Sequence, residues 1–283
     1  MSLSVVLPAK NEAATIADVI KGVLEYCAQA QVVVVDDGST DNTAALAAEA
    51  GAMVISHPYS KGNGAAIKTG ARAATGDVIV FMDGDGQHAP SDIPRLLARL
   101  DEGYDLVVGA RQQGSQASVG RGLANGFYNR LASYMTGHSV EDLTSGFRAV
   151  RAEKFREFLY LLPNGFSYPT TSTMAFFRAG YSVAYEPIHA AQRIGKSHIK
   201  PFKDGVRFLL IIFKIGTLYS PLKLFAPIAM LAFLVATGWY GYTLGAFGRF
   251  TNMSALLYTG SVMVFLMGLI SEQITALMYR GGQ

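Results

Sequence analysis

The sequence predicts an α/β domain with a mostly parallel sheet, followed by a two-helix transmembrane hairpin. Short apolar stretches alternate with amphipathic stretches at helical spacing through the first part of the chain. Acids, amides and glycines cluster after three of the predicted strands. The last 62 residues hold only the four charges of Lys223, Arg249, Glu272 and Arg280, although 16% of all 283 residues are charged. This split excludes a purely soluble enzyme and a disordered scaffold.

The first predicted strand is Ser4–Pro8, a short apolar run that ends in a proline. An amphipathic helix follows, because apolar residues recur at i, i+3, i+4, i+7 and i+8 from Ile16 to Leu24. Gln31–Val35 is a run of four valines after a glutamine and predicts a strand buried on both faces.

The next elements keep the alternation. Ser39, Thr40 and Asp41 offer N-caps for an alanine-rich helix that reaches Ala50. The remaining predicted elements are strand Met53–Ser56, helix Gly64–Ala74, strand Val78–Met82, a helix capped by Ser91 and Asp92, and a strand over Leu106–Val108. Strict alternation of strands and helices implies parallel strands joined by right-handed crossovers.

Polar side chains follow three strands at the point where each strand ends. These are Asn11 and Glu12, then residues 36–39 (DDGS), then residues 83–87 (DGDGQ). Open α/β sheets bind ligands at the carboxyl ends of their strands, so three converging clusters predict a site. The acid–glycine–acid loop after the third of these strands suits Mg²⁺ or Mn²⁺ beside a diphosphate, and the alternative is a plain Asp-Gly turn.

A glycine-rich stretch with Lys61 and glycines at 62, 64 and 70 predicts a loop that approaches a phosphate. It is not a P-loop, because GxxxxGK[ST] is missing, and it is not a full dinucleotide fingerprint, because Ile67 stands where the third glycine belongs.

Two uncharged runs near the end of the chain are long enough to cross a bilayer. Leu224–Phe247 has 24 residues and Thr251–Ser271 has 21. At about 1.5 Å per residue the longer run makes a helix of roughly 36 Å. The alternative is a buried core hairpin in a soluble protein. Glu272, at the end of the second run, is expected to pair or to snorkel near the membrane surface.

Basic residues set the expected orientation. Seven Lys or Arg and one acid lie between Arg193 and Lys223, whereas the opposite loop has only Arg249. The positive-inside rule therefore places the N-terminal domain in the cytoplasm. Residues 199–221 predict an amphipathic interfacial helix with a basic side toward lipid headgroups, and an ordinary packing helix is the alternative. The net charge of +3 does not by itself imply a nucleic-acid partner, and none is expected. A single cysteine, Cys27, excludes an intrachain disulfide and a cysteine-built zinc site.

Six segments together resemble the family 2 glycosyltransferases, in the same order along the chain. They are VVLPAKNEA (5–13), VVDDGSTDNT (34–43), SKGNGAAIKTGARAATGD (60–77), FMDGDGQH (81–88), VVGAR (107–111) and DLTSGFRAV (142–150). The resemblance covers roughly 4–198 and is strongest to the dolichyl-phosphate mannose synthase and bacterial polyprenyl-phosphate glycosyltransferase group. It implies a GT-A fold. One departure is His198, which stands where the family usually has lysine.

The resemblance also implies residue roles. Pro8, Ala9, Glu12 and Asp37 would hold the base and ribose of a nucleotide sugar, and Lys61 and Gly84 would complete the donor site. Asp83, Asp85 and Gln87 would surround Mg²⁺ or Mn²⁺ and the diphosphate. Arg111, Arg121, Ser145, Arg193 and Lys196 stand where the family binds donor or lipid phosphate, and Asp85, Arg121 and Asp142 form the expected catalytic set.

Asp142 matches the acid often described as the catalytic base. A phosphate monoester, with a second pKa near 6, is already mostly an anion at pH 7 and needs little deprotonation. Asp142 is therefore a base or a positioning residue that holds the sugar or an arginine such as Arg148.

The expected protein is a membrane-bound inverting glycosyltransferase that moves a sugar from a UDP- or GDP-sugar to a polyprenyl phosphate. Its expected parts are a GT-A domain over 1–198, a juxtamembrane helix over 199–221 and two transmembrane helices over 222–283. A homo-oligomer is compatible with the resemblance. The alternatives are a non-catalytic nucleotide-sugar-binding membrane scaffold, and a processive polysaccharide synthase. The synthase should carry a QxxRW signature, yet the only tryptophan, Trp239, lies inside the first span.

Overall fold

The computed structural model describes residues 1–111, 119–165, 167–189, 217 and 219–280. The chain divides into two compact units, Met1–Pro201 and Phe202–Gln283. The predicted boundaries at 198 and 221 stay a prediction, since residues 190–216 lie outside the described part of the chain.

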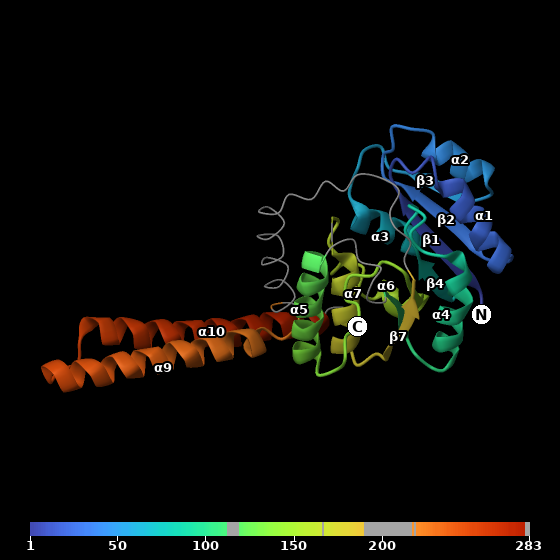
Figure 1. Cartoon of the computed structure of the whole chain (residues 1–283). Coiled ribbons are helices and arrows are strands. Elements are labelled where there is room, and N and C mark those ends of the chain that lie inside the picture. Colours follow the sequence, from blue (N-terminus) through green and yellow to red (C-terminus); the bar gives the residue numbers. More distant parts are fainter. Residues whose placement is uncertain (112–118, 166, 190–216, 218, 281–283) are drawn as a thin grey trace. The chain divides into compact units, whose positions relative to one another are not determined.

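A seven-stranded sheet forms the centre of the first unit (Figure 1). Its order is β3-β2-β1-β4-β6-β5-β7. The strands are β1 Leu3–Ala9, β2 Gln31–Asp36, β3 Met53–Ser56, β4 Val78–Phe81, β5 Leu106–Arg111, β6 Arg148–Arg151 and β7 Val183–Ile188. The prediction of a mostly parallel sheet is confirmed. Strict parallelism is wrong at one strand, because β6 runs antiparallel to both β4 and β5.

The antiparallel strand matters for the site. In the register of β4 and β6, Phe81 pairs with Arg148 and Val78 pairs with Arg151. The start of β6 therefore lies beside the carboxyl end of β4. This direction brings residues 142–147, which precede β6, to the edge of the sheet where Asp83 follows β4. The alternating pattern of the sequence stops at β5, so it contained no signal for this strand.

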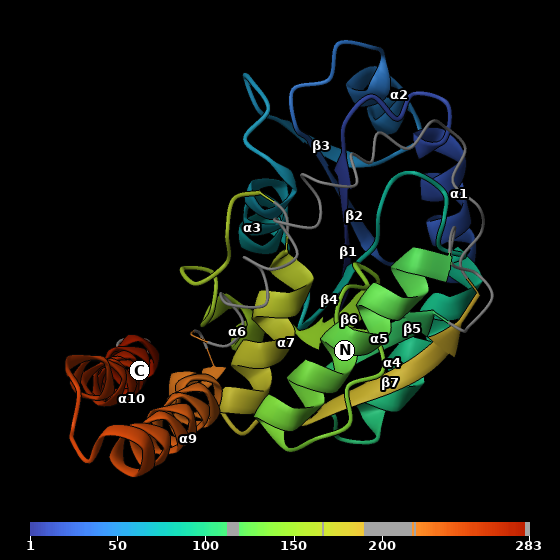
Figure 2. The ribbon, with the colours of Figure 1, turned by 60° about the vertical axis from the view of Figure 1, so that its left-hand side comes forward.

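Helices cover both faces of the sheet (Figure 2). They are α1 Ile16–Tyr26, α2 Thr43–Glu49, α3 Asn63–Ala73, the 3₁₀ turn Pro90–Asp92, α4 Ile93–Asp101, α5 Val119–Thr136, α6 Ala152–Arg156 and α7 Tyr168–Arg178. Val5, Leu7 and Val34 belong to one core with the buried residues of α1, α2 and α4. Gly70 of α3 faces Val6 and Val35 on the other side. Both faces of β1 and β2 are buried, which explains their continuous valine runs.

The second unit contains a helical hairpin of α9 Pro221–Phe247 and α10 Asn252–Arg280. Gly248 ends α9 in the left-handed conformation, with φ 63°. Mean hydropathy reaches 1.7 in α9 and 1.9 in α10, and only 11% and 17% of the most apolar stretches are buried. A core helix of a soluble protein would bury most of such a stretch, so the exposed apolar surface favours membrane anchoring.

Glu272 of α10 closes the open end of this hairpin. Its carboxylate accepts hydrogen bonds from the Leu222 amide at 3.2 Å and the Ser220 hydroxyl at 3.3 Å, at the start of α9. The first amides of a helix have no partner within the helix, so the acid caps α9. Gly268 allows the helices to approach, because a Cβ there would lie 2.7 Å from the Cβ of Phe225. The predicted pairing of Glu272 is thus with the first turn of α9.

Candidate active site

A cleft of about 510 Å³ opens at the carboxyl ends of β1, β2 and β4. Eight of the predicted site residues line it: Pro8, Ala9, Glu12, Asp37, Asp83, Gly84, Asp85 and Gln87. Lys10, Ser60, Gly62, Asn63 and Ala66 complete the lining. The three polar clusters of the sequence therefore converge as expected from parallel strands, and they do so around a space large enough for a small-molecule ligand.

Asp37 organises one wall of this cleft. Its Oδ1 accepts hydrogen bonds from His57 Nδ1 at 2.8 Å and the Lys61 amide at 2.8 Å. Its Oδ2 accepts from the Ser60 hydroxyl at 2.7 Å and the Gly62 amide at 2.9 Å. Burial raises the pKa of Asp37, but these hydrogen bonds outweigh it and hold the pKa at about 2. The carboxylate thus stays ionised and fixes the loop between β3 and α3.

The acid–glycine–acid loop forms the floor of the cleft after β4. Thr15 donates to the Gly84 carbonyl at 2.8 Å, and the Gln87 amide donates to Asp85 Oδ1 at 3.1 Å. Gly146 leaves space beside Asp83, because a Cβ there would lie 3.0 Å from Asp83 Oδ2. The loop is therefore held by its neighbours while both acids line the cleft.

The donor set of this loop fits a divalent cation that arrives with a diphosphate. Within the described ranges no group of three or more His, Cys, Asp or Glu side chains could hold a metal ion. The carboxylates of Asp83 and Asp85 and the side-chain carbonyl of Gln87 would each offer oxygen as the ligand atom. Mg²⁺ and Mn²⁺ favour oxygen donors, and Mg²⁺ usually binds through one or two carboxylates, with water and substrate phosphate filling its other positions.

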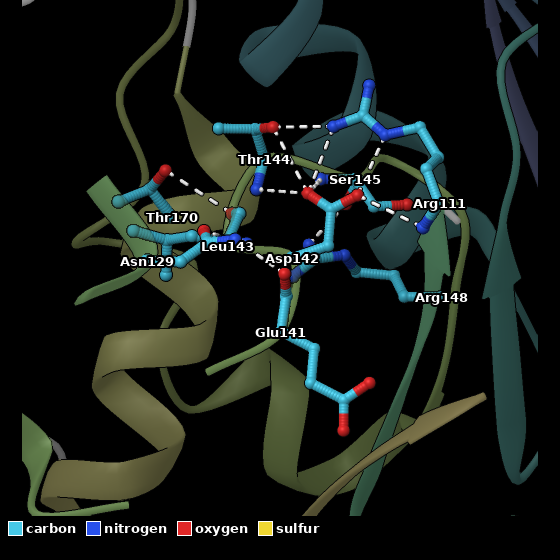
Figure 3. A network of polar contacts seen from close by, with 9 residues as sticks. All are labelled: Arg111, Asn129, Glu141, Asp142, Leu143, Thr144, Ser145, Arg148 and Thr170. Carbon is cyan, nitrogen blue, oxygen red and sulfur yellow. Dashed lines mark hydrogen bonds and ion pairs between the residues drawn. The ribbon is translucent and has the colours of Figure 1, made fainter. Parts of the chain in front are cut away.

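Asp142 and Arg111 form the second polar centre, shown in Figure 3. Arg111 Nε donates to Asp142 Oδ2 at 2.7 Å, and Nη2 donates to Oδ1 at 2.9 Å. The amides of Thr144 and Ser145 also donate to Oδ1, at 3.0 and 3.1 Å. Burial raises the pKa of Asp142, but the Arg111 guanidinium and the amides lower it below its ordinary value. This carboxylate is engaged on both oxygens and suits a positioning role better than a proton acceptor.

Residues 4–159 match the model of the protein family described as glycosyl transferase family 2. The chain belongs to this family. Residues 220–277 of the glycosyltransferase match a second family, the GtrB C-terminal hairpin. Glycosyltransferase AglJ of Haloferax volcanii is 28% identical to it over 292 residues, which cover 98% of this chain and 94% of the relative.

Solved structures show the same GT-A fold. Glucosyl-3-phosphoglycerate synthase of Mycobacterium tuberculosis, in complex with Mn²⁺, UDP-glucose and phosphoglyceric acid, superposes with a TM-score of 0.62 at 26% identity. The match covers 76% of this chain and 78% of that chain. The same enzyme with phosphoglyceric acid alone gives 0.61 at 24% identity, over 76% and 79% of the two chains.

The structure describes only some of the residues predicted to bind phosphate in this glycosyltransferase. The Arg111 guanidinium and the Ser145 amide both donate hydrogen bonds to Asp142. The Ser145 hydroxyl is buried and has no hydrogen-bond partner among the described residues. Arg121 lies on α5, but its side chain falls outside the described part. Arg193 and Lys196 lie in the segment 190–216, which the structure does not describe.

Arg148 of the glycosyltransferase has a different partner set from the one expected. Its side chain is fully buried, and Nη1 donates to the Pro169 carbonyl at 3.0 Å and the Ser172 hydroxyl at 2.8 Å. Nη2 donates to the Ser145 carbonyl. The arginine that Asp142 holds is therefore Arg111, whereas Arg148 ties the loop before β6 to the start of α7.

His88 is a site neighbour to which sequence reasoning gave no role, although it ends the segment FMDGDGQH. It is buried and its ring stacks on Phe147 with centroids 5.2 Å apart. Burial lowers the pKa of His88 to about 4, against the opposite effect of Asp85. The imidazole is consequently neutral at pH 7 and packs behind the acid loop.

The glycine-rich stretch packs against the chain rather than leaving its amides open to a phosphate. The amides of Gly64 and Ala65 donate to the carbonyls of Gly165 at 3.1 Å and Asn164 at 2.9 Å. The Lys61 side chain does not line the cleft, and its Nζ lies 5.9 Å from the centroid of the Tyr59 ring. Gly62 and Gly64 are required because residues 163–165 pack on the start of α3, where a Cβ would lie 2.6 Å from the Asn164 carbonyl oxygen at position 62 and 2.0 Å from that of Pro163 at position 64.

Replacing Gly64 by alanine should destabilise the first unit by at least about 2 kcal/mol. A Cβ at this position would lie 2.0 Å from the Pro163 carbonyl oxygen, so the backbone of one segment must move. Thermal unfolding in detergent measures the effect. Gly126→Ala is the matched control, because that helical glycine has nothing within 4 Å of its Cβ position and should be neutral or slightly stabilising. Equal melting temperatures for the two variants would contradict this packing role.

Proposed function

We propose that this glycosyltransferase moves a sugar from a nucleotide diphosphate donor to a polyprenyl phosphate, with inversion at the sugar carbon. The observation that carries the proposal is the combination, in one chain, of an acid-lined cleft on an α/β sheet and an exposed apolar hairpin. The cleft supplies a site for a water-soluble donor, and the hairpin keeps the enzyme at the surface where a lipid acceptor resides.

The donor is expected in the cleft between β1, β2 and β4. Pro8, Ala9, Glu12 and Asp37 line this cleft together with the acid loop and would contact the nucleoside. The loop of Asp83, Asp85 and Gln87 would hold Mg²⁺ or Mn²⁺ with the diphosphate. The solved M. tuberculosis relative contains Mn²⁺ and UDP-glucose, which supports this class of ligand. When bound, the cation would neutralise the charge that develops on the leaving nucleoside diphosphate.

The acceptor phosphate needs cations around it, because it approaches a donor that is also an anion. We assign Arg121, Arg193 and Lys196 to this phosphate, with the Ser145 hydroxyl as a further donor. Arg111 contributes positive charge from its ion pair with Asp142. Asp142 orients Arg111 and the loop that carries Ser145, and the phosphate attacks as the anion it already is.

The side of the membrane on which the catalytic unit lies is inferred from the distribution of basic residues around the hairpin. The basic segment from Arg193 to Lys223 ends in the first turn of α9, and the loop between the two helices of the hairpin has only Arg249. The positive-inside rule favours a catalytic unit on the cytoplasmic face, with two spans.

Incubating the full-length protein in vesicles with polyprenyl phosphate and radiolabelled UDP- or GDP-sugars tests the proposal. We expect label in the organic-extractable lipid, with loss of label when the lipid phosphate is replaced by the free polyprenol. A scaffold would bind nucleotide sugar without transfer. A processive synthase would instead place label in water-soluble or precipitable polymer, and either result would overturn the proposal.

A further inference from the structure

His57 is a buried histidine to which the proposed function gives no part. It directly follows β3, its relative exposure is 7%, and it does not line the donor cleft. Its ring nevertheless contacts a residue that does line the cleft, because Nδ1 lies 2.8 Å from Asp37 Oδ1. His57 can therefore act on the cleft without entering it.

Both ring nitrogens of His57 are engaged. The pKa of Asp37 is about 2, so its carboxylate is ionised and can only accept hydrogen bonds. His57 Nδ1 must therefore carry the hydrogen of this contact. On the other side of the ring, Nε2 lies 3.0 Å from the hydroxyl of Thr69 in α3. Thr69, His57 and Asp37 thus form a tether of side-chain hydrogen bonds between α3 and the cleft.

The tether ends on a loop that forms one wall of the cleft. Asp37 accepts hydrogen bonds from the Ser60 hydroxyl and the Gly62 amide, and both of these residues line the cleft. The Lys61 amide between them donates to Asp37 as well. Residues 57–62 belong to no helix or strand, so contacts of this kind determine where the wall lies.

His57 is anchored more firmly than the wall that it supports. Its amide donates to the Asp36 carbonyl at the end of β2, at 2.8 Å, while its ring is held by Thr69. The donors from Ser60 and Gly62 belong to the wall itself and would move with it. The fixed imidazole therefore sets the direction of the Asp37 carboxylate, and the carboxylate in turn sets the position of the wall.

Resting on the proposed function, we propose that His57 is a positioning residue of the donor site, which holds Asp37 and, through it, the wall of Ser60 and Gly62 in the shape that binds the nucleotide. His57 touches none of the reacting atoms. Its loss weakens the ground state and the transition state equally, so it changes donor affinity and leaves the chemical step as fast as before.

Calorimetry on the full-length protein in detergent with Mn²⁺ tests this inference. UDP and GDP are the probes, and the one that binds wild type more tightly is used for all variants. His57→Phe keeps a planar ring and removes both nitrogens, and we expect its nucleotide affinity to be roughly tenfold lower because a hydrogen bond to a charged group is lost.

Two further variants separate the two nitrogens of His57. The side-chain amide of His57→Asn lies near the position of Nδ1, can donate to Asp37, and should keep the affinity within about threefold of wild type. His57→Gln extends its amide to the position of Nε2, where it reaches Thr69 and not Asp37. It should bind the nucleotide as weakly as His57→Phe.

Steady-state kinetics distinguish positioning from a general loss of structure. In His57→Phe the KM for the nucleotide sugar should rise about tenfold, whereas kcat and the KM for polyprenyl phosphate should stay within about twofold of wild type. Tyr181→Phe is the matched control, because it removes the hydrogen bonds to Glu157, at 2.9 and 3.0 Å, from a residue that does not line the cleft. It should lower the melting temperature without changing nucleotide affinity.

A His57→Phe variant with wild-type nucleotide affinity would overturn the inference, and so would one whose kcat falls while the KM for the donor stays the same. If His57→Phe does not fold, the other two variants decide, since equal nucleotide affinities of His57→Asn and His57→Gln would contradict the role of the Asp37 contact.

These outcomes are separable from those of the proposed function. Nucleotide affinity that depends on His57, in a protein that transfers nothing to polyprenyl phosphate, keeps the positioning role and removes the lipid acceptor. Transfer to the lipid, with unchanged donor affinity in His57→Phe, keeps the acceptor and removes the positioning role.

Discussion

Asp85→Asn should lower the rate of sugar transfer by roughly a hundred- to a thousandfold without unfolding the protein. Asp85 lines the cleft in the loop after β4, where its Oδ1 also accepts the Gln87 amide at 3.1 Å. The amide side chain of asparagine can still accept that hydrogen bond, but it removes the negative charge that a divalent cation needs. Stabilisation of the leaving diphosphate by a cation amounts to several kcal/mol, and each 1.36 kcal/mol is a factor of ten in rate.

Steady-state transfer with and without chelator measures this effect. Wild-type activity should disappear in excess chelator and return with Mg²⁺ or Mn²⁺, whereas Asp85→Asn should respond to added cation only weakly. Asp101→Asn, which removes an exposed acid at the end of α4, is the matched control and should keep full activity. Full wild-type activity in excess chelator would rule out the metal assignment.

The placement of the cleft could be predicted because it depends on strand direction alone. Glu12, Asp37 and Asp83 each follow a strand with an unmistakable apolar run, and parallel strands bring their carboxyl ends to one edge. This prediction of where the cleft lies requires no knowledge of which side chains from distant segments contact one another. The same reasoning located the hairpin, since a run of more than twenty uncharged residues determines a span by length.

Contacts between distant segments could not be predicted in this way. Asp37 binds His57 and Ser60, which belong to a loop with no periodic pattern. Asp142 forms its ion pair with Arg111, which is 31 residues earlier in the chain, and not with Arg148, which is closer in sequence. That choice depends on the antiparallel strand β6, which is only four residues long and has no distinctive composition.

The Asp142–Arg111 pair makes a second prediction, on stability. Asp142→Asn should destabilise the protein by about 1.5–3 kcal/mol, because a buried carboxylate that accepts a two-pronged hydrogen bond from Arg111 is replaced by a neutral group. The folded-state pKa of Asp142 lies below its ordinary value of 3.8. The ion pair therefore contributes its full stability above about pH 4 and loses it as the pH falls further. Unfolding midpoints of wild type and variant should accordingly converge in acid.

The pH dependence of transfer decides whether Asp142 is a base. The pKa of the Asp142 carboxylate is lowered by its hydrogen bonds with Arg111, Thr144 and Ser145. Asp142 should therefore not titrate between pH 5 and 8 and should not shape the pH profile of transfer there. Any decline in kcat/KM near pH 6 should come from the second ionisation of the lipid phosphate, and it should persist in Asp142→Asn even though that variant is slower. Arg111→Lys should be slow as well, because a point charge does not reproduce the planar fork. A decline near pH 6 that is present in the wild type and absent in Asp142→Asn would show that Asp142 takes the proton after all.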